Sequence, residues 1–252
     1  MTSQRGIQSI EVGGRLLQAL AREGRAMALK DLAAAAGMPP AKAHPYLVSF
    51  GKLGLIVQDA GNGRYGLGPL ALQIGLISLQ QVDPLRLATE QLPALAQALG
   101  QTVGITVWGE QGATVVRTEE APSPVHVTMR HGAVMSLAGT ASGRLFAAHL
   151  PRAVVRAAWR AETGRAGFDA AFEAELAAIR AAGVSHVVDK AVVGVSGLAA
   201  PVFDGSGQLV LALTAIGATA GFDVRPQGAA ARELLRCAQG LTAQLGGQPA
   251  AA

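Results

Sequence analysis

The sequence predicts an α+β protein in which a winged helix-turn-helix domain is followed by a linker helix and a larger domain with an antiparallel sheet. Three observations predict this fold class. Apolar residues recur at helical spacing in the first region, a hairpin signal closes that region, and beyond residue 100 strand patterns lie on both sides of a group of helices. We expect the domain boundaries at residues 1–68, 69–82 and 83–247.

Three short helices are expected in the first 68 residues. Ser9 is the expected N-cap of the first helix. The second covers about 30–36 and ends at Gly37, a residue that permits a left-handed turn between closely packed helices. The third follows Pro39 and runs to about Lys52. The short interval between the second and third helices is typical of a helix-turn-helix.

A hairpin signal follows the third helix. Two short apolar runs, 55–58 and 64–67, flank Asn62-Gly63, and Asn-Gly between such runs favours a tight β-turn. Three helices and a hairpin in this order predict the winged variant of the fold. Residues 61–66 also match the spacing G-x-G-x-x-G. A dinucleotide site needs a helix directly after these glycines, so we expect no nucleotide cofactor.

The remaining chain alternates between helical and strand patterns. Strands, then helices, then strands again are typical of an antiparallel sheet with helices packed on it. The expected helices are 69–81, 85–99 with an interruption at Pro93, 140–149, 152–161, 169–182 and 226–245, and the expected strands are 102–108, 113–118, 125–129, 184–188, 198–203 and 209–216, before a disordered tail from 246.

The excess positive charge is confined to the first quarter of the chain. Residues 1–68 hold eight Lys or Arg and four Asp or Glu, whereas the other residues hold 13 of each. Together with the winged helix-turn-helix pattern, this predicts double-stranded DNA as a partner. On charge alone, a solvated basic surface without a partner is the alternative. The candidate DNA contacts are Lys42, His44 and Ser49 in the third helix, Arg64 in the hairpin, and the basic residues Lys30 and Arg5.

Several classes of function find little support in the sequence. Cys237 is the only cysteine, which excludes a disulfide framework and an all-thiolate metal site. The five histidines are scattered, and no G-x-S-x-G nucleophile motif occurs. The longest apolar run, of about 12 residues, is too short to span a membrane. We expect a cytoplasmic protein without a catalytic centre, metal or cofactor.

One helix start in the larger domain predicts an anion site. Thr140 is a good N-cap, so the backbone amides of Ala141 and Ser142 would have no acceptor within the helix. Such amides and the helix dipole together attract a carboxylate. The alternative is that water or the Thr140 hydroxyl satisfies these amides and that nothing binds.

Motifs along almost the whole chain resemble the IclR-type family of bacterial transcriptional regulators. In the first region they are Gly6-Ile7-Gln8-Ser9-Ile10-Glu11, Ala28-Leu29-Lys30-Asp31-Leu32-Ala33, Gly37-Met38-Pro39, Ala43-His44, Gly54-Leu55-Ile56, Gly63-Arg64-Tyr65 and Leu67-Gly68-Pro69. In the second they are Thr140-Ala141-Ser142-Gly143-Arg144 and Ala199-Ala200-Pro201-Val202-Phe203-Asp204.

The resemblance implies an effector-binding domain with a GAF-like fold and assembly into homodimers or tetramers. The positions that resemble the family's effector contacts are Ala141, Ser142, Asp189, Gly197, Thr214 and Ile216. Trp108, Met129 and Met135 are candidates for an apolar wall, with ordinary core packing as the alternative. We therefore expect a small organic effector, a carboxylate with an apolar or aromatic body.

The third helix departs from the family pattern. The family usually has polar residues at the places of Pro40, Ala41 and Pro45, and Pro45 is expected to kink the helix because it lacks a backbone donor. These departures favour an alternative function, a small-molecule sensor or enzyme-like binding protein that has lost specific DNA binding. The main prediction is a ligand-responsive DNA-binding regulator.

Overall fold

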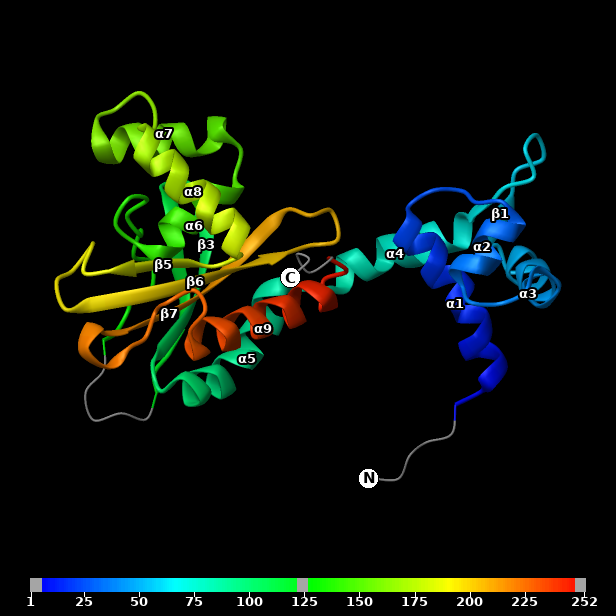
Figure 1. Ribbon diagram of the computed structural model, residues 1–252, viewed down its shortest axis with the longest axis horizontal. Coiled ribbons are helices and arrows are strands. Elements are labelled where there is room, and N and C mark those ends of the chain that lie inside the picture. Colours follow the sequence, from blue (N-terminus) through cyan, green and yellow to red (C-terminus); the bar gives the residue numbers. More distant parts are fainter. Residues whose placement is uncertain (1–5, 122–126, 248–252) are drawn as a thin grey trace. The chain divides into compact units, whose positions relative to one another are not determined.

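The computed structural model describes residues 6–121 and 127–247 (Figure 1). Arg5, one of the expected DNA contacts, lies outside the described residues, as do 125–126 of an expected strand and 248–252 of the expected tail. The chain divides into two compact units, Met1–Val82 and Asp83–Ala252.

The first unit holds three helices, a two-stranded hairpin and a fourth helix. These elements are α1 (Gln8–Glu23), α2 (Leu29–Ala35), α3 (Pro40–Lys52), β1 (Ile56–Gln58), β2 (Tyr65–Leu67) and α4 (Pro69–Gln81). Their core is aliphatic, and its fully buried members include Leu16, Leu32 and Leu47, one from each of the first three helices. The predicted helix-turn-helix and hairpin are confirmed.

The turn between α2 and α3 depends on a glycine and on a small neighbour. Gly37 has φ +68°, in the left-handed region, and its amide donates to the carbonyl of Ala34. The side chain of Ala33 is fully buried where α2 and α3 pack, so a larger residue would separate the two helices. This turn therefore fixes how α3 is presented.

The second unit is built on a five-stranded antiparallel sheet of order β4-β3-β7-β6-β5. Its strands are β3 (Thr102–Gly109), β4 (Gly112–Glu119), β5 (Ser185–Val188), β6 (Val195–Phe203) and β7 (Leu209–Ala218). Its helices are α5 (Pro84–Leu99), α6 (Ala141–His149), α7 (Arg152–Thr163), α8 (Ala170–Ala182) and α9 (Ala229–Gln244), with a 3₁₀ turn at Thr219–Gly221.

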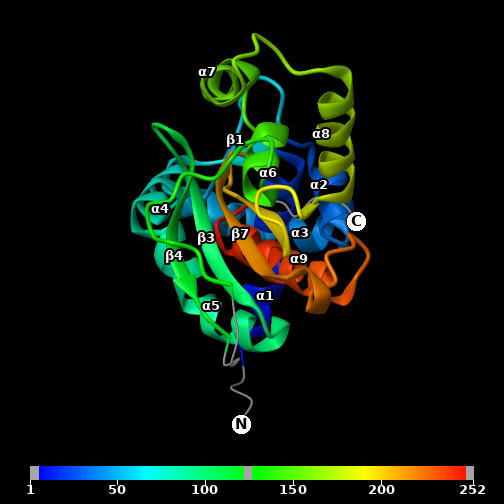
Figure 2. The ribbon, with the colours of Figure 1, turned by 90° about the vertical axis from the view of Figure 1, so that its left-hand side faces the viewer.

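Helices cover both faces of this sheet. In Figures 1 and 2, α5 and α9 lie on one face, while α6 and α8 lie on the other. The inner strand β6, between β7 and β5, is consequently buried along nearly its whole length. A strand covered on both faces reads as a continuous apolar run, which the stretch Leu198 to Val202 does. The expected α+β fold with an antiparallel sheet is confirmed.

Three local expectations are wrong. The first helix begins at Gln8 with Ile7 as N-cap, so Ser9 lies inside it and caps nothing. Pro93 does not interrupt α5; its ring is exposed on the outer side of the helix, where water can reach the carbonyl that loses its donor. Residues 127–129 form no strand, because the chain pairs with β4 only later, around Val134.

Candidate functional site

The outer face of α3 carries the residues expected to contact DNA. Lys42, His44 and Ser49 are exposed, whereas Ala43 and Leu47 on the opposite side of the helix are buried in the core. The Ser49 hydroxyl donates to the carbonyl of Pro45 at 3.0 Å, so it is left as an acceptor. The free donors on this face are therefore those of Lys42 and His44.

Pro45 is accommodated within α3. The helix runs without a break from Pro40 to Lys52, although the proline ring cannot donate to the carbonyl of Ala41. Both residues are exposed. The carbonyl of Ala41 therefore lacks a helical donor at an exposed position of α3.

The hairpin is fixed by its own turn and by the loop before α2. The Asp59 carboxylate accepts from the amides of Gly61 and Asn62, and Met27 exchanges two backbone hydrogen bonds with Tyr65. Arg64 is exposed, and its guanidinium donates to the carbonyl of Ala26 at 3.4 Å. Lys30 is exposed at the start of α2, so two further cations lie on the surface of this unit.

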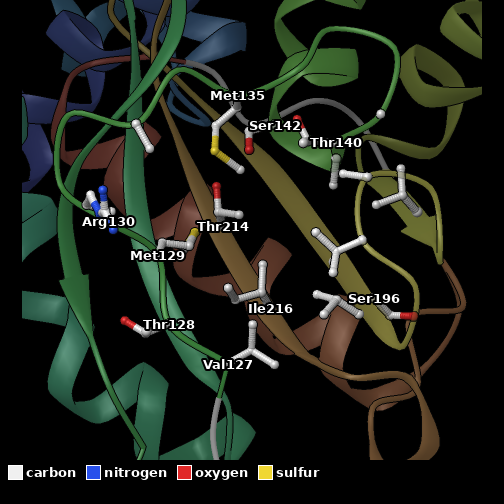
Figure 3. A pocket seen from close by; sticks show the side chains of 18 residues that line it. Val127, Thr128, Met129, Arg130, Met135, Thr140, Ser142, Ser196, Thr214 and Ile216 are labelled. Atoms are coloured by element: carbon white, nitrogen blue, oxygen red, sulfur yellow. The ribbon is translucent and has the colours of Figure 1, made fainter.

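The second unit contains a cavity of about 290 Å³ between the start of α6, the strands β6 and β7, and two loops (Figure 3). Such a volume suits a small organic molecule. Its walls are mostly aliphatic. The lining residues are Val127, Thr128, Met129, Arg130, Ala133, Met135, Gly139, Thr140, Ala141, Ser142, Val187, Ala191, Val192, Val195, Ser196, Gly197, Thr214 and Ile216.

The start of α6 presents unsatisfied polar groups to this cavity. Thr140 is the N-cap, and its hydroxyl accepts from the amide of Gly143 at 3.0 Å. Within the described chain, the amides of Ala141 and Ser142 have no acceptor. The Ser142 hydroxyl is buried and is also without a partner there. A buried polar atom without a partner is costly, so a bound acceptor at this place would stabilise the structure.

A tight turn positions this helix start. The carbonyl of Ser136 accepts from the Thr140 amide at 3.2 Å and from its hydroxyl at 2.7 Å. From α7, the Glu162 carboxylate accepts from the Ser136 hydroxyl and the Leu137 amide, both at 2.6 Å, and from the Ala138 amide at 3.2 Å. The free amides at the start of α6 are therefore held in place by a network of charge-assisted hydrogen bonds.

The sheet supplies the floor of the cavity. Gly197 of β6 pairs with Ile216 of β7 in the register of the two strands, and both line the cavity. Thr214 is buried two residues before Ile216, and its hydroxyl lies 3.2 Å from that of Thr106 on β3. In Figure 3, Thr214 and Ile216 lie between Met129 on one side and Ser196 on the other.

Six of the eight expected effector contacts line this cavity, namely Ala141, Ser142, Gly197, Thr214, Ile216 and Met129. Asp189 does not line it. Its carboxylate accepts from the Gly194 amide of its own loop at 2.9 Å and from the Thr219 hydroxyl, in the 3₁₀ turn after β7, at 2.6 Å. Trp108 does not either, because its ring packs against Phe146 in the core, 5.8 Å between centroids. For Trp108 the alternative, ordinary core packing, is correct.

The sequence reasoning missed the two loops that complete the cavity. Residues from 127–133 form one wall, where a strand was expected over 125–129, and Ala191 and Val192, in the loop before β6, lie on the other side. Arg130 in the first loop is the one charged residue among those that line the cavity in the described chain. Loop residues follow no periodicity, so no signal in the sequence singled it out.

Potential metal ligands and the cysteine bear on other classes of site. In the described part of the chain, no group of three or more His, Cys, Asp or Glu side chains is placed to hold a metal ion. Burial raises the pKa of the Cys237 thiol, which disfavours the nucleophilic thiolate.

Among the residues described, no helix is both long enough and apolar enough to cross a bilayer.

Comparisons with known proteins agree with this geometry. Residues 9–60 match the model of the IclR helix-turn-helix domain, and residues 77–243 match that of the bacterial transcriptional regulator IclR C-terminal domain. The glycerol operon regulatory protein of Streptomyces griseus is 32% identical over 96% of this chain and 98% of its own. Its counterpart in Streptomyces coelicolor is 30% identical over 79% of this chain and 80% of its own.

Solved structures extend the match to the fold. The crystal structure of Pseudomonas aeruginosa HmgR is similar with a TM-score of 0.87 and 38% identity, covering 96% of this chain and 99% of that one. The Agobacterium tumefaciens repressor BlcR shares the fold, with a TM-score of 0.76 and 20% identity over 97% of this chain and all of its own. With a helix-turn-helix domain for DNA binding followed in the sequence by an effector domain, this chain belongs to the IclR family of bacterial transcriptional regulators.

Proposed function

We propose that this regulator acts in the cytoplasm, binds operator DNA as a homodimer through residues 1–68, and responds to a small carboxylate with an apolar body in the cavity of its second unit. Binding of the effector would shift the equilibrium between conformations that differ in DNA affinity, with α4 as the connection. The observation that carries the ligand proposal is the start of α6, where two free amides and the buried Ser142 hydroxyl meet a mostly aliphatic cavity.

Charge and exposure support the DNA-binding part of the proposal. All of the net charge of +4 belongs to residues 1–68. Lys42, His44, Lys30 and Arg64 are exposed there, and phosphate contacts by such cations dominate the affinity of DNA-binding proteins. A recognition helix in the major groove is usually presented twice, by a two-fold dimer, to two half-sites.

Exposed aliphatic side chains on α4 support the dimer. Leu72, Ile74, Leu76 and Ile77 are all exposed on this helix. Leu70, at the start of the same helix, is half-buried, and its amide donates to the carbonyl of Gly54. Exposed aliphatic side chains in this number favour burial against a second copy of the chain.

The ligand proposal is tested by comparing the affinity of the protein for a carboxylic acid with its affinity for the corresponding uncharged amide. Isothermal titration of the full chain with benzoate and benzamide should give tighter binding of the acid, because only the acid brings a negative charge to the free amides. Ser142→Pro removes one amide donor and should erase most of the difference. Equal binding of acid and amide by the unmodified protein would place the anion site elsewhere or exclude it.

A second variant separates the amide from the hydroxyl. Ser142→Ala keeps the backbone donor and removes only the buried hydroxyl, which has no partner in the described chain. It should retain the preference for the acid that Ser142→Pro loses. If both variants lose the preference equally, the hydroxyl rather than the helix start recognises the carboxylate.

A further inference from the structure

The cavity has a second polar end, opposite in character to its aliphatic walls. Arg130 lies in the loop that closes the cavity beside Met129, on the side away from Ser196 (Figure 3). Within the described chain its guanidinium has neither a carboxylate partner nor a hydrogen-bond acceptor. Arg130 is exposed, so its guanidinium is accessible to a ligand at the rim of the cavity.

The loop around Arg130 is fixed to the sheet. The backbone carbonyl of Arg130 accepts from the amide of Ala133. The carbonyl of Ala133 in turn accepts from the amide of Val115 on β4. The amide of Gly132 also donates to Val115, at 2.8 Å, and the imidazole of His131 lies 2.8 Å from the Thr118 hydroxyl. The backbone that follows Arg130 is therefore held against β4, which limits where the guanidinium can reach.

Beneath this loop, the side chain of Met129 packs closely against β3. A Cβ added to Gly104 of β3 would lie 2.8 Å from the terminal methyl of Met129, so the absence of a side chain at Gly104 lets Met129 settle onto the sheet. Met129 is itself buried. The residue next to Arg130 in sequence is thus anchored in the cavity wall, and Arg130 remains at its rim.

The described residues that line the cavity contribute positive charge and no negative charge. No Asp or Glu side chain is among its lining residues in the described chain. The start of α6 contributes the positive end of a helix dipole, and Arg130 contributes a full positive charge. Asp189 does not line the cavity, and its carboxylate accepts from the Thr219 hydroxyl and the Gly194 amide. Two positive sites with aliphatic surface between them fit a ligand that is anionic at two places.

We propose that Arg130 is a specificity-determining residue which makes this cavity select a small dicarboxylate with an apolar body, one carboxylate at the start of α6 and the other at the guanidinium. The inference rests on the proposed function, because it assumes that the first carboxylate binds at α6. Arginine suits this role, since its planar fork can donate two hydrogen bonds to one carboxylate.

The test uses the full chain and three related probes. Benzoate has one carboxylate, while isophthalate and terephthalate carry a second at different separations on the same ring. We expect at least one of the two dicarboxylates to bind about 10-fold more tightly than benzoate, as a partly solvated charge-assisted contact provides. Arg130→Gln should abolish this preference and change the affinity for benzoate by less than about 2-fold.

Arg117→Gln is the matched control. Arg117 is exposed on β4, does not line the cavity, and its guanidinium donates to the carbonyl of Val116. Removal of its charge should leave the preference for the dicarboxylate intact, whereas a general effect of net charge would lower it in both variants.

Each outcome separates the two proposals. If benzoate binds and the unmodified protein shows no preference for either dicarboxylate, or if Arg130→Gln retains the preference, the role of Arg130 is refuted and the proposed function stands. Equal losses in Arg130→Gln and Arg117→Gln would also refute the role of Arg130. If neither benzoate nor the dicarboxylates bind, the carboxylate site at α6 fails and this inference fails with it.

Discussion

Substitution of Gly143 by alanine should destabilise the second unit strongly, although alanine is normally the better helix residue. Gly143 lies in the first turn of α6. A Cβ at this position would lie 2.1 Å from the carbonyl oxygen of Ser136 and 2.7 Å from the Cα of Leu137. Both are backbone atoms, so a rotamer change cannot relieve the contact. The turn before α6 must move by about 1 Å, given that carbon–oxygen contacts are normally well above 3 Å.

The magnitude follows from what that movement breaks. The carbonyl of Ser136 accepts two hydrogen bonds from Thr140, and the Ser136 hydroxyl and Leu137 amide donate to Glu162. Loss of three or four such bonds at about 1 kcal/mol each lowers the free energy of unfolding by about 3–4 kcal/mol. In a unit of this size, that corresponds to a fall of about 6–16 °C in the unfolding temperature.

Differential scanning calorimetry of the full chain measures this effect, and Gly240→Ala provides the control. Gly240 lies in α9 of the same unit, and nothing lies within 4 Å of a Cβ added there. That variant should be more stable by about 0.5–1 kcal/mol, the usual gain of alanine over glycine within a helix. If Gly143→Ala is as stable as the unmodified protein, the close approach between α6 and the turn is wrong.

Four further predictions concern other elements. Glu162→Gln should lower the free energy of unfolding by about 1.5–3 kcal/mol in urea titrations, since the carboxylate accepts three hydrogen bonds; an unchanged midpoint would contradict this. Pro45→Arg should raise DNA affinity in fluorescence anisotropy by adding a cation and a backbone donor, and a drop would mean that the proline belongs to the docking geometry. Light scattering should give a mass at least twice 25.6 kDa, and Ile74→Lys should lower it, unless α4 is not the interface. Burial, assisted by the charge of Arg180, lowers the pKa of His149 to about 4. Below about pH 6.5, His149 therefore binds a proton in the unfolded chain but stays neutral in the native state. The free energy of unfolding should fall by about 2 kcal/mol from pH 7 to pH 5, and His149→Gln should remove this loss.

Periodicity and turn chemistry predicted most of the fold. The glycine turn at Gly37, the Asn62-Gly63 hairpin and the N-cap at Thr140 all act locally, so the residues that form them are close in sequence. Pro93 shows the limit of local rules, because whether a proline breaks a helix depends on which face it occupies. Its exposed position on α5 could be known only from the packing of that helix.

The candidate site was predictable where it lies on regular elements. Ala141 and Ser142 follow from the N-cap at Thr140, whereas Gly197, Thr214 and Ile216 were expected from the resemblance to the family and lie on two paired strands. Asp189 and Arg130 were not predictable in the same way. The carboxylate of Asp189 is satisfied by Thr219, thirty residues further on, and Arg130 lies in a loop whose position depends on β4. Tertiary contacts of this kind leave no pattern in a single sequence.

The salt dependence of DNA binding tests the central claim most directly. Affinity of the full chain for the DNA upstream of its own coding region should be measured between 50 and 300 mM salt, concentrations chosen at roughly the physiological range. We predict that the logarithm of affinity falls against the logarithm of salt with a slope steeper than about −4, which corresponds to four or more phosphate contacts.

Two variants assign that slope to the first unit. Lys42→Gln should make it shallower by about 2, since a dimer loses one phosphate contact from each copy. Arg160→Gln, which removes an exposed cation from the second unit, should leave it unchanged. A binding constant that does not vary with salt, or an equal change in both variants, would contradict DNA binding through residues 1–68 and favour a sensor that has lost it.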